Sequence, residues 1–472
     1  MKIALLHYHL KPGGVTGVIK SQLKALKDDC EILVLTGVQP PREFEEKAVY
    51  VPGIGYDQDN PKSVSAQQTA ERIYKAISAI WPEGCDVLHI HNPLLAKNRK
   101  FLDIISCLRE KGFALLLQVH DFAEEGRPGA YCGDTPYPEN CHWAVINSRD
   151  YQILENAGLA KAGLHLLANP VTPLFPSTPN KEPGAGPKFV LYPVRAIRRK
   201  NIGEALLLSL YFPDNTGLAV TLPPNSARDW KYYLKWKEFA GELNLNTIFE
   251  ASEKYGFETL VSNAEFFLTT SITEGFGFAF LEPWTAEKAI FGRKLDVCED
   301  FRSAGMIMDH LYETLPLPFS WIDKELFRRR WFACIEQIHE KYGTEPESEK
   351  IEAGFKTITQ GGLIDFAVLD ETFQKQVIRK VQNDLGAAKL LLDINPVLKE
   401  LSDPGMPEIL IRANRDAVLR HFGMEAYRRR LLDAYKKVAR EPVNHSINKS
   451  RLLKEFLSPE KFSLLKWCDD EI

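Results

Sequence analysis

Short apolar runs alternate with amphipathic stretches through the N-terminal part of the chain. Each run is rich in Val, Ile and Leu and is flanked by polar or turn residues, which is typical of buried parallel strands. The predicted strands are Lys2–His7, Cys30–Thr36, Asp86–His91, Ala114–His120, His142–Asn147 and Leu164–Val171. Apolar residues at a three-to-four spacing predict helices over Gly17–Leu26, Val64–Trp81 and Lys97–Lys111. This alternation predicts a doubly wound parallel sheet.

The same pattern restarts after a segment dense in proline and glycine, Pro173–Lys188, which is predicted to be a linker. The strands predicted after it are Phe189–Val194, Gly217–Leu222, Asn246–Ala251, Ala264–Thr270 and Lys288–Arg293. Residues 1–172 and 189–323 are therefore predicted to be two Rossmann-like domains, joined by the linker 173–188. Open α/β sheets bind ligands at the carboxyl ends of their strands, so we expect the two domains to face a cleft there.

The strand pattern stops at about residue 320, and residues 324–472 are predicted to form an extended helical region. Its last strong helix is predicted over Arg415–Val438. One stripe of that helix is apolar: Val418, Phe422, Tyr427, Leu431, Tyr435 and Val438. Such a stripe is typical of core packing. We therefore expect part of the region to pack back on the preceding domains.

Composition and charge narrow the class of protein. The chain has 472 residues, which favours two or three domains, and its 44% hydrophobic and 26% charged residues are typical of a soluble globular protein. A net charge of −4 gives no electrostatic support for nucleic acid binding. No apolar run is long enough to span a bilayer, which needs about 20 residues. Peripheral membrane contact stays open.

The N-terminus and the cysteines indicate a cytoplasmic location. The start, MKIALLHYHL, is better explained as a first strand than as a signal peptide. The eight cysteines form no C-x-x-C pair, and several lie in apolar or strand-like contexts that favour reduced, buried thiols. Cys132, Cys141 and His142 lie close in sequence, but their spacing fits no zinc pattern.

The most informative segment is SITEGFGFAFLEPWTAEKAIFGRK, residues 271–294. Glu274 follows a predicted strand, glycines 275 and 277 allow a tight turn, and a helix is predicted over Phe278–Ala286. A strand end, a glycine turn and a helix N-terminus together suit an anion, and Glu274 and Glu282 can accept hydrogen bonds from hydroxyls. The segment therefore suits a ligand that is part phosphate and part sugar. On spacing alone, a corner with two solvated glutamates explains it equally well.

The full string resembles the Glu-x7-Glu donor motif of family 4 glycosyltransferases, which are retaining enzymes of the two-domain B-type (GT-B) fold. The chain departs from the family pattern at Pro283-Trp284 and Glu287-Lys288. The resemblance implies that Glu282 accepts hydrogen bonds from the donor ribose and that Glu274 binds hydroxyls of the transferred sugar. It also implies that the turn binds the donor through Gly275, Phe276, Gly277 and Phe278.

Two further segments resemble the family's donor site. In LYPVRAIRRKN, residues 191–201, the matching residues are Arg195 and Lys200, which the resemblance implies bind the donor diphosphate. The neighbouring Arg198 and Arg199 are expected to be a solvated basic helix start. In the first βα turn, the resemblance implies that Gly13 and Gly14 let backbone amides approach the donor phosphate. The alternative there is an ordinary tight turn.

That first turn does not support a nicotinamide cofactor. It is not a G-x-G-x-x-G sequence, and Thr36 ends the second predicted strand where a dinucleotide site requires an acid.

His120 and the loop after it are the candidates in the first domain. His120 lies at the end of a predicted strand, and the resemblance implies a place near the reacting sugar, where it could donate a hydrogen bond to a hydroxyl or to the leaving phosphate. A structural histidine is the alternative. The downstream loop is long and polar, as binding loops often are. It offers acceptor-binding candidates at Asp121, Glu125 and Arg127.

The resemblance therefore implies transfer of a sugar from a nucleotide-diphosphate sugar to a hydroxyl acceptor with retention, assisted by the leaving phosphate. The expected catalytic residues are His120, Glu274, Arg195 and Lys200. No tightly bound cofactor is expected. No metal is expected either, because Asp57-Gln58-Asp59 is better explained as a turn than as a metal–diphosphate motif. Two alternatives stay open: another B-type enzyme, such as a sugar-nucleotide epimerase or a phosphorylase, and a non-catalytic binding module.

Overall fold

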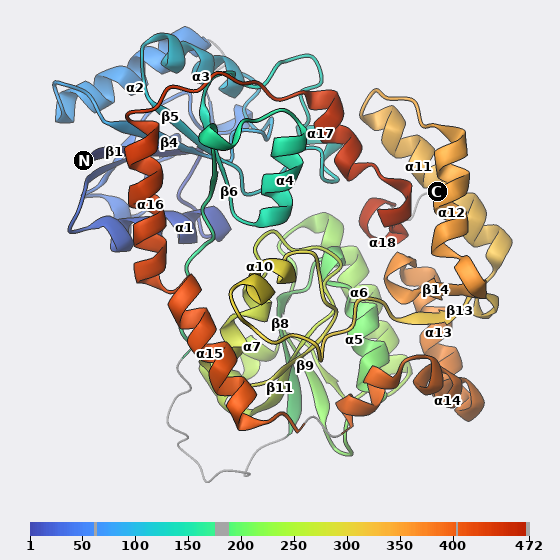
Figure 1. Cartoon of the computed structure of the whole chain (residues 1–472). Helices are drawn as coiled ribbons and strands as arrows, with labels where there is room; N and C mark the ends of the chain where they lie inside the picture. Colours follow the sequence, from blue (N-terminus) through green and yellow to red (C-terminus); the bar gives the residue numbers. More distant parts are fainter. Residues whose placement is uncertain (61–63, 175–187, 403–404, 469–472) are drawn as a thin grey trace. The chain divides into compact units, whose positions relative to one another are not determined.

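The computed structural model describes residues 1–60, 64–174, 188–402 and 405–468 (Figure 1). Its chain divides into two compact units. Unit 1 comprises Met1–Pro170, Lys341–Gly343 and Phe422–Phe456, and unit 2 comprises Val171–Glu340, Thr344–His421 and Leu457–Ile472. All but three residues of the predicted linker, 173–188, lie outside the described residues.

Unit 1 is built on a parallel sheet of seven strands in the order β3-β2-β1-β4-β5-β6-β7. The strands are β1 (Lys2–His7), β2 (Glu31–Thr36), β3 (Ala48–Tyr50), β4 (Val87–His91), β5 (Leu115–Gln118), β6 (His142–Val145) and β7 (Leu164–Leu166). The helices between them are α1 (Gly14–Leu26), α2 (Ala66–Ile80), α3 (Phe101–Glu110) and α4 (Ser148–Asn156). Every strand predicted in this region is present, and β3 was missed.

The C-terminal part of unit 1 covers one face of this sheet. Helix α16 (Met424–Val438) buries Tyr427, Leu431 and Tyr435 completely, in the same core as β1 and α1. Figure 1 shows α16, in red, beside the blue α1. The prediction of one helix over Arg415–Val438 is wrong: α15 (Glu408–Phe422) ends and α16 begins on either side of Gly423, whose backbone is extended. Glycine has a low helix propensity, which favours a break there.

Unit 2 contains a second parallel sheet, in the order β10-β9-β8-β11-β12. Its strands are β8 (Phe189–Arg195), β9 (Gly217–Leu222), β10 (Thr247–Ile248), β11 (Ala264–Thr269) and β12 (Ile290–Gly292). Its helices are α5 (Ile202–Ser209), α6 (Ala227–Glu242), α7 (Ala251–Tyr255), α8 (Phe257–Asn263), α9 (Glu282–Thr285) and α10 (Cys298–Ser303). All five predicted strands are present, and β10 is the most shortened because α7 begins at Ala251.

The remainder of unit 2 is mainly helical. It contains α11 (Lys324–Lys341), α12 (Ser348–Ile358), α13 (Glu371–Asn383), α14 (Leu385–Ile394), α15 and α18 (Leu464–Trp467). The expectation that strands stop near residue 320 is wrong, since β14 (Leu363–Asp365) pairs antiparallel with β13 (Pro316–Pro318). The expectation of reduced cysteines is wrong for Cys334 and Cys468, which form a disulfide. The predicted fold class, two doubly wound α/β sheets with a helical C-terminal region, is confirmed.

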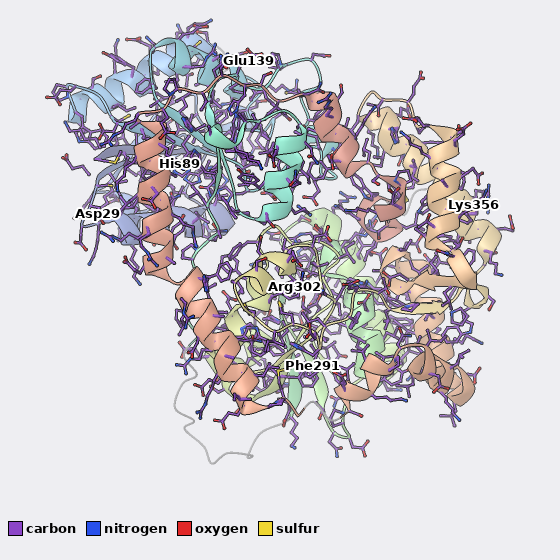
Figure 2. The ribbon with its side chains drawn as sticks, in the orientation of Figure 1. Asp29, His89, Glu139, Phe291, Arg302 and Lys356 are labelled. Atoms are coloured by element: carbon purple, nitrogen blue, oxygen red, sulfur yellow. A yellow bond between two sulfur atoms is a disulfide. The ribbon has the colours of Figure 1, made fainter. Side chains whose placement is uncertain are left out.

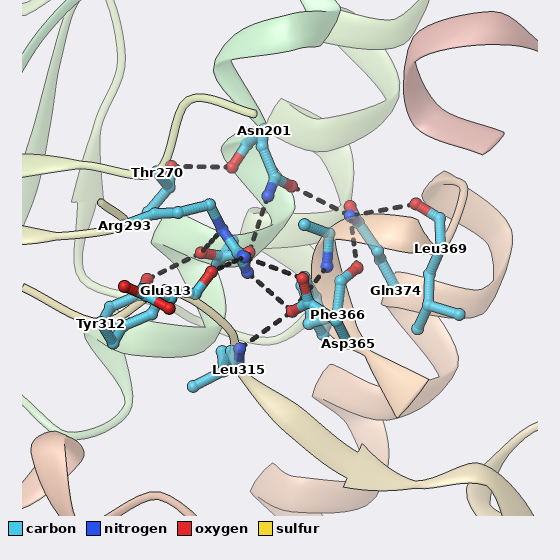
Figure 3. A network of polar contacts seen from close by, with 12 residues as sticks. Asn201, Thr270, Arg293, Tyr312, Glu313, Leu315, Asp365, Phe366, Leu369 and Gln374 are labelled. Carbon is cyan, nitrogen blue, oxygen red and sulfur yellow. Dashed lines mark hydrogen bonds and ion pairs between the residues drawn. The ribbon is translucent and has the colours of Figure 1, made fainter. Parts of the chain in front are cut away.

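A buried ionic network joins this helical part to the second sheet (Figure 3). The guanidinium of Arg293, which follows β12, makes paired hydrogen bonds to Glu204 of α5 at 3.0 and 2.8 Å and to Asp365 of β14 at 2.8 Å each. The Tyr312 hydroxyl also donates to Glu204, at 2.7 Å. The side chains of Arg293 and Glu204 are 4% and 0% exposed. Because each buried charge has a partner, the network fixes how these elements pack.

Candidate functional site

Glu274 lies in the turn after β11, and two cations bind its carboxylate. The Lys200 ammonium donates to Oε1, and the Arg199 guanidinium donates to Oε2 at 3.0 Å. The Glu274 side chain is 8% exposed and that of Lys200 13%. The three side chains form one ion cluster, which we call the 199/200/274 cluster, with a net charge of +1.

Burial and neighbouring charge act in opposite directions on this cluster. Burial favours the neutral carboxyl, but Lys200 and Arg199 overcome it and hold the pKa of Glu274 at about 2. Burial together with Arg199 lowers the pKa of Lys200, and Glu274 opposes that shift. Glu274 is therefore an anion at neutral pH.

Hydrogen bonds from the second sheet fix the backbone of Lys200. Its carbonyl accepts hydrogen bonds from the Tyr192 hydroxyl of β8 and from Thr270 Oγ1 at 3.0 Å. Asn201 follows in the left-handed conformation, with φ 56°, and the same threonine hydroxyl donates to its carbonyl at 3.0 Å (Figure 3). Asn201 also accepts from Gln374 of α13 at 2.9 Å. Lys200 is thus held at the carboxyl ends of β8 and β11.

The expectation of two solvated arginines is wrong for Arg198, which is buried, while Arg199 is 37% exposed but paired. Arg199 binds Glu274, as described above. Arg198 makes a bidentate ion pair with Glu371 of α13 at 2.6 and 2.7 Å, and both side chains are 8% exposed. Its guanidinium also lies 4.1 Å from the ring centroid of Tyr232. Arg198 therefore attaches the segment to α13 and α6 instead of facing solvent.

Arg195, predicted to pair with Lys200, lies apart from the cluster. Its side chain is exposed and donates to the Pro223 carbonyl at 3.0 Å. Within the described ranges no hydrogen bond or ion pair connects it to Glu274 or Lys200. Arg195 is thus free to turn toward a ligand, whereas Lys200 is already engaged.

The glycine turn is compact, and the helix after it is shorter than predicted. Only a single 3₁₀ turn (Phe278–Phe280) and the four-residue α9 occupy the expected helix over Phe278–Ala286. Gly277 has φ 90°, and a Cβ there would lie 3.0 Å from the Phe280 ring, so glycine is required at this position. Phe276 is buried beneath the turn, while Phe278 is 37% exposed.

Glu282 begins α9 and differs from Glu274 in its partners and in the direction of its pKa shift. Its carboxylate makes no hydrogen bond or ion pair within the part of the chain that the structure describes. Burial alone raises its pKa to about 7. A half-buried carboxyl without a partner is costly to the fold, which is a common property of ligand-binding groups.

In unit 1, Gly13 and Gly14 lie at the start of α1. Gly13 is extended, with φ 174°, and neither glycine lies in the left-handed region. A Cβ at Gly14 would meet no atom within 4 Å, and one at Gly13 would meet only the Lys11 carbonyl, at 3.9 Å. Neither the backbone nor the neighbouring atoms require glycine here, so both positions leave open space.

His120 follows β5 and is fixed through its backbone and its ring. Its N–H donates to Asn92 Oδ1 at 3.1 Å, and its Nε2 lies 3.0 Å from Nδ1 of the buried His91. Burial lowers the pKa of His120 to about 4, against the opposing effect of Asp121, so the ring is neutral at pH 7. The predicted residue is therefore part of a histidine cluster that the sequence interpretation did not include.

The acceptor candidates form two separate pairs. Arg127 donates to Asp121 at 2.6 Å, with both side chains about two-fifths exposed. Glu125 instead pairs with Arg149 of α4 at 3.5 Å and is largely buried. Of the three candidates, Asp121 and Arg127 are thus accessible to a ligand, and Glu125 is held by the protein itself.

The sequence carries a signal for two further residues of these clusters, Arg199 and His91, that the prediction did not use. Arg199 stands directly before Lys200, and the order R-R-K allows two cations to reach one carboxylate. His91 stands in H-I-H at the end of β4, where alternate residues share one face of the strand. Gln22, which binds His91, carries no signal in the sequence, because its contact depends on how α1 packs.

In the portion of the chain described, no group of three or more His, Cys, Asp and Glu side chains is placed to hold a metal ion. Asp57–Asp59 forms a 3₁₀ turn, in which Asp57 accepts from the Arg99 N–H at 3.2 Å. Among the helices described, none is long and apolar enough to cross a membrane.

Comparison with known proteins places these features in a class. No family model matches the chain. It is 26% identical to mannosylglucosyl-3-phosphoglycerate synthase of Petrotoga mobilis over 515 aligned positions, covering 98% of each chain.

Solved structures with the same fold include two from cyanobacteria. Sucrose-phosphate synthase from Thermosynechococcus elongatus superimposes with a TM-score of 0.53 at 15% identity, covering 93% of this chain and 98% of that one. Anabaena HepE, solved with UDP and glucose, gives 0.53 at 12% identity, covering 92% and 99%. Together with residues 271–294, these likenesses identify the chain as a nucleotide-sugar glycosyltransferase of the GT-B fold, similar to family 4.

Proposed function

We propose that the protein transfers a sugar from a nucleoside-diphosphate sugar to a hydroxyl acceptor with retention of anomeric configuration, and that it needs neither a metal ion nor a tightly bound cofactor. The observation that carries the proposal is the 199/200/274 cluster beside a glycine turn and the unpaired Glu282. The cluster supplies positive charge for a diphosphate, and the two glutamates supply acceptors for sugar hydroxyls.

Lys200 has a defined role in this proposal. Its ammonium is held by Glu274 in the free protein, and an incoming diphosphate offers it a second anionic partner. Arg199 keeps Glu274 charged while Lys200 turns, and the exposed Arg195 can join from the adjacent strand. Donors preorganised around the leaving group lower the barrier by several kcal/mol, as they do in other enzymes that stabilise developing charge.

Glu282 and Glu274 divide the rest of the donor in this proposal. The unpaired carboxylate of Glu282 accepts hydrogen bonds from the ribose, a contact made equally in the ground and transition states. Glu274 orients the transferred sugar at the reacting carbon. In unit 1, Gly13 and Gly14 leave space for the donor, His120 contacts the sugar, and Asp121 with Arg127 contacts the acceptor.

The name of the Petrotoga relative supports a class of acceptor to test first. Its product, mannosylglucosyl-3-phosphoglycerate, contains a phosphate on a sugar-linked glycerate. We therefore propose an anionic, sugar-linked phosphoglycerate as the acceptor. We also propose that the reaction takes place in the cytoplasm.

Product analysis tests the proposal directly. The protein is incubated with nucleoside-diphosphate sugars and the phosphoglycerate acceptor in excess chelator, and the anomeric configuration of the product is determined by NMR. Retention with full activity in chelator is expected. Inversion would exclude the retaining mechanism, and loss of activity restored by Mg²⁺ or Mn²⁺ would exclude metal independence. Conversion of donor without acceptor would instead favour an epimerase.

A further inference from the structure

His91, the last residue of β4, is completely buried, and both of its ring nitrogens have hydrogen-bond partners. Its Nε2 lies 3.0 Å from Oε1 of Gln22 on α1, which is also 0% exposed. Its Nδ1 lies 3.0 Å from Nε2 of His120. Gln22, His91 and His120 therefore form a continuous line of hydrogen bonds from the core of unit 1 to the end of β5.

The chemistry of these groups determines where each proton lies. An amide oxygen can only accept, so the proton of His91 lies on Nε2. Burial lowers the pKa of His91 well below the ordinary value, so the ring is neutral and carries one N–H. His91 Nδ1 is then an acceptor, and His120 must donate to it from Nε2. Because His120 is neutral too, its Nδ1 carries a lone pair.

The surroundings hold this arrangement in place. Gln22 Nε2 points to Gln118 Oε1, at 3.5 Å, which directs the amide oxygen toward His91. The ring of His91 is nearly parallel to those of His89 and His120, at interplanar angles of 26° and 20°, with centroids 4.4 and 5.3 Å away. His89, labelled in Figure 2, is in turn bound by the Tyr435 hydroxyl of α16 at 2.9 Å. Two helices and two strands thus restrain one imidazole.

We propose that Gln22 and His91 are positioning residues that hold His120 in its Nε2–H tautomer, so that His120 accepts a hydrogen bond at Nδ1 from a sugar hydroxyl. The role of the hydroxyl rests on the proposed function. In the part of the chain described, Nδ1 of His120 has no hydrogen-bond partner. A lone pair on Nδ1 repels a phosphate oxygen, so this nitrogen selects hydroxyl groups. His120 therefore cannot donate to the leaving phosphate, contrary to what the sequence suggested.

The tautomer is measured on the free protein by NMR. Long-range ¹H–¹⁵N correlations of the imidazole rings are recorded with ¹⁵N-histidine, and His120 is assigned by the signals lost in His120→Gln. We expect a protonated Nε2 and an unprotonated Nδ1. The opposite tautomer would overturn the inference.

Two variants of Gln22 extend the test. Gln22→Met keeps the volume but removes the acceptor, and we expect a mixed tautomer at His120 and a kcat lowered about three- to tenfold, the value of one hydrogen bond, with nucleotide affinity unchanged. Gln22→Glu restores an acceptor and should restore the single tautomer. A single unchanged tautomer in Gln22→Met would overturn the role of Gln22. If Gln22→Met does not fold, the wild-type spectrum still decides the tautomer.

Substrate analogues test the direction of the bond to the hydroxyl. Each hydroxyl of the transferred sugar is replaced in turn by hydrogen and by fluorine, which accepts but cannot donate. At the hydroxyl bound by His120, both analogues should lose activity equally, and the loss should disappear in His120→Leu, whose side chain offers no acceptor. A fluoro analogue that keeps most of the activity at that position would overturn acceptance by His120. The NMR test needs no substrate, so failure of the proposed function would appear separately, as absence of transfer by a protein with the expected tautomer.

Discussion

Individual residues in the proposed donor site differ in how much of their interaction energy is already used within the protein. Lys200 and Glu274 satisfy each other, Arg195 is exposed, and Glu282 has no partner in the region described. A residue satisfied by a neighbour exchanges one partner for another when a ligand binds, whereas an unsatisfied one gains a partner. The effects of substitution should follow this difference.

Lys200→Ala should weaken nucleoside-diphosphate binding by about 2–5 kcal/mol, because a buried charge pair to the ligand is lost. Arg195→Ala should cost less than about 1.4 kcal/mol, or tenfold in Kd, because the side chain is exposed. Calorimetric titration with nucleoside diphosphate compares the two variants, and Arg72→Ala on α2 is the control. Unchanged affinity in Lys200→Ala would remove that residue from the donor site.

Glu282→Gln should stabilise the fold while weakening donor binding. The pKa of about 7 lies above the ordinary 4.5, so the folded protein binds a proton between these pH values that the unfolded chain does not. The free energy of unfolding contributed by this group therefore falls as the pH rises through that window. At pH 8 the variant should be more stable than the wild type by about 1–3 kcal/mol, and at pH 4.5 the difference should vanish.

Denaturant titrations at both pH values check this stability change, and calorimetry checks nucleotide affinity. The matched variant is Glu274→Gln, which should keep nucleotide affinity and lose turnover, because the role proposed for Glu274 is to orient the reacting sugar. If Glu274→Gln loses nucleotide affinity and Glu282→Gln does not, the two roles are reversed.

At the scale of elements, the helical part of unit 2 packs against residues 198–201, which carry the proposed donor-binding Lys200. Helix α13 reaches residues 198–201 through Glu371 and Gln374, and β14 reaches α5 through Asp365 and Arg293. These contacts give the helical region a positioning role in unit 2, which the sequence did not suggest.

Arg293→Met should destabilise the protein by about 3–5 kcal/mol, because Glu204 and Asp365 would lose the cation that both carboxylates share. Arg302→Met is the matched control: Arg302, labelled in Figure 2, pairs with Glu299 on the surface, with side chains 61% and 52% exposed. Its loss should cost no more than about 1 kcal/mol. Denaturant unfolding of both variants measures the contrast, and equal effects would contradict a structural role for the network.

The sequence predicted elements whose pattern is local and missed those that depend on distant contacts. The predicted bounds of β1 and β9 match the structure, because each is a continuous apolar run between turns. Strand β3 has only three residues, none of them fully buried, and gives too short a pattern to detect. The break at Gly423 was missed because the apolar stripe continues across it. Glu274 and Glu282 were predicted as site residues from their motif, whereas the pairing with Arg199 and the Gln22–His91–His120 line depend on tertiary packing.

At the scale of the whole molecule, several buried histidines make the free energy of unfolding depend on pH. Burial, reinforced by neighbouring histidines, lowers the pKa of His7 and His89 to about 3 and that of His165 to about 4. Below pH 6.5 the unfolded chain binds protons that these folded groups do not, so the free energy of unfolding falls as the pH falls toward 4. Each pKa unit corresponds to about 1.4 kcal/mol. Buried carboxyls with raised pKa act in the opposite sense: Glu124 and Asp150 in unit 1, and Glu204 and Glu282 in unit 2.

We therefore expect the free energy of unfolding to decrease by several kcal/mol between pH 7 and pH 5, since the histidines outnumber the opposing carboxyls in unit 1. Denaturant titrations at pH 7, 6 and 5 measure the slope. His165→Gln should reduce it. A stability that stays constant over this range would show that the buried histidines accept protons without unfolding.

The assignment of α16 to unit 1 has a consequence for biosynthesis. Unit 1 contains the first 170 residues, yet about 250 residues separate them from the segment that completes its core. At 5–20 residues per second, a ribosome needs about 12–50 s to synthesise that interval. During this time one apolar face of the nascent sheet lacks Tyr427, Leu431 and Tyr435 and stays exposed to the cell. The order of the chain therefore makes residues 1–170 a client for chaperones until residues 422–456 have been synthesised, and a fragment ending at residue 170 should aggregate unless residues 422–456 are supplied in trans.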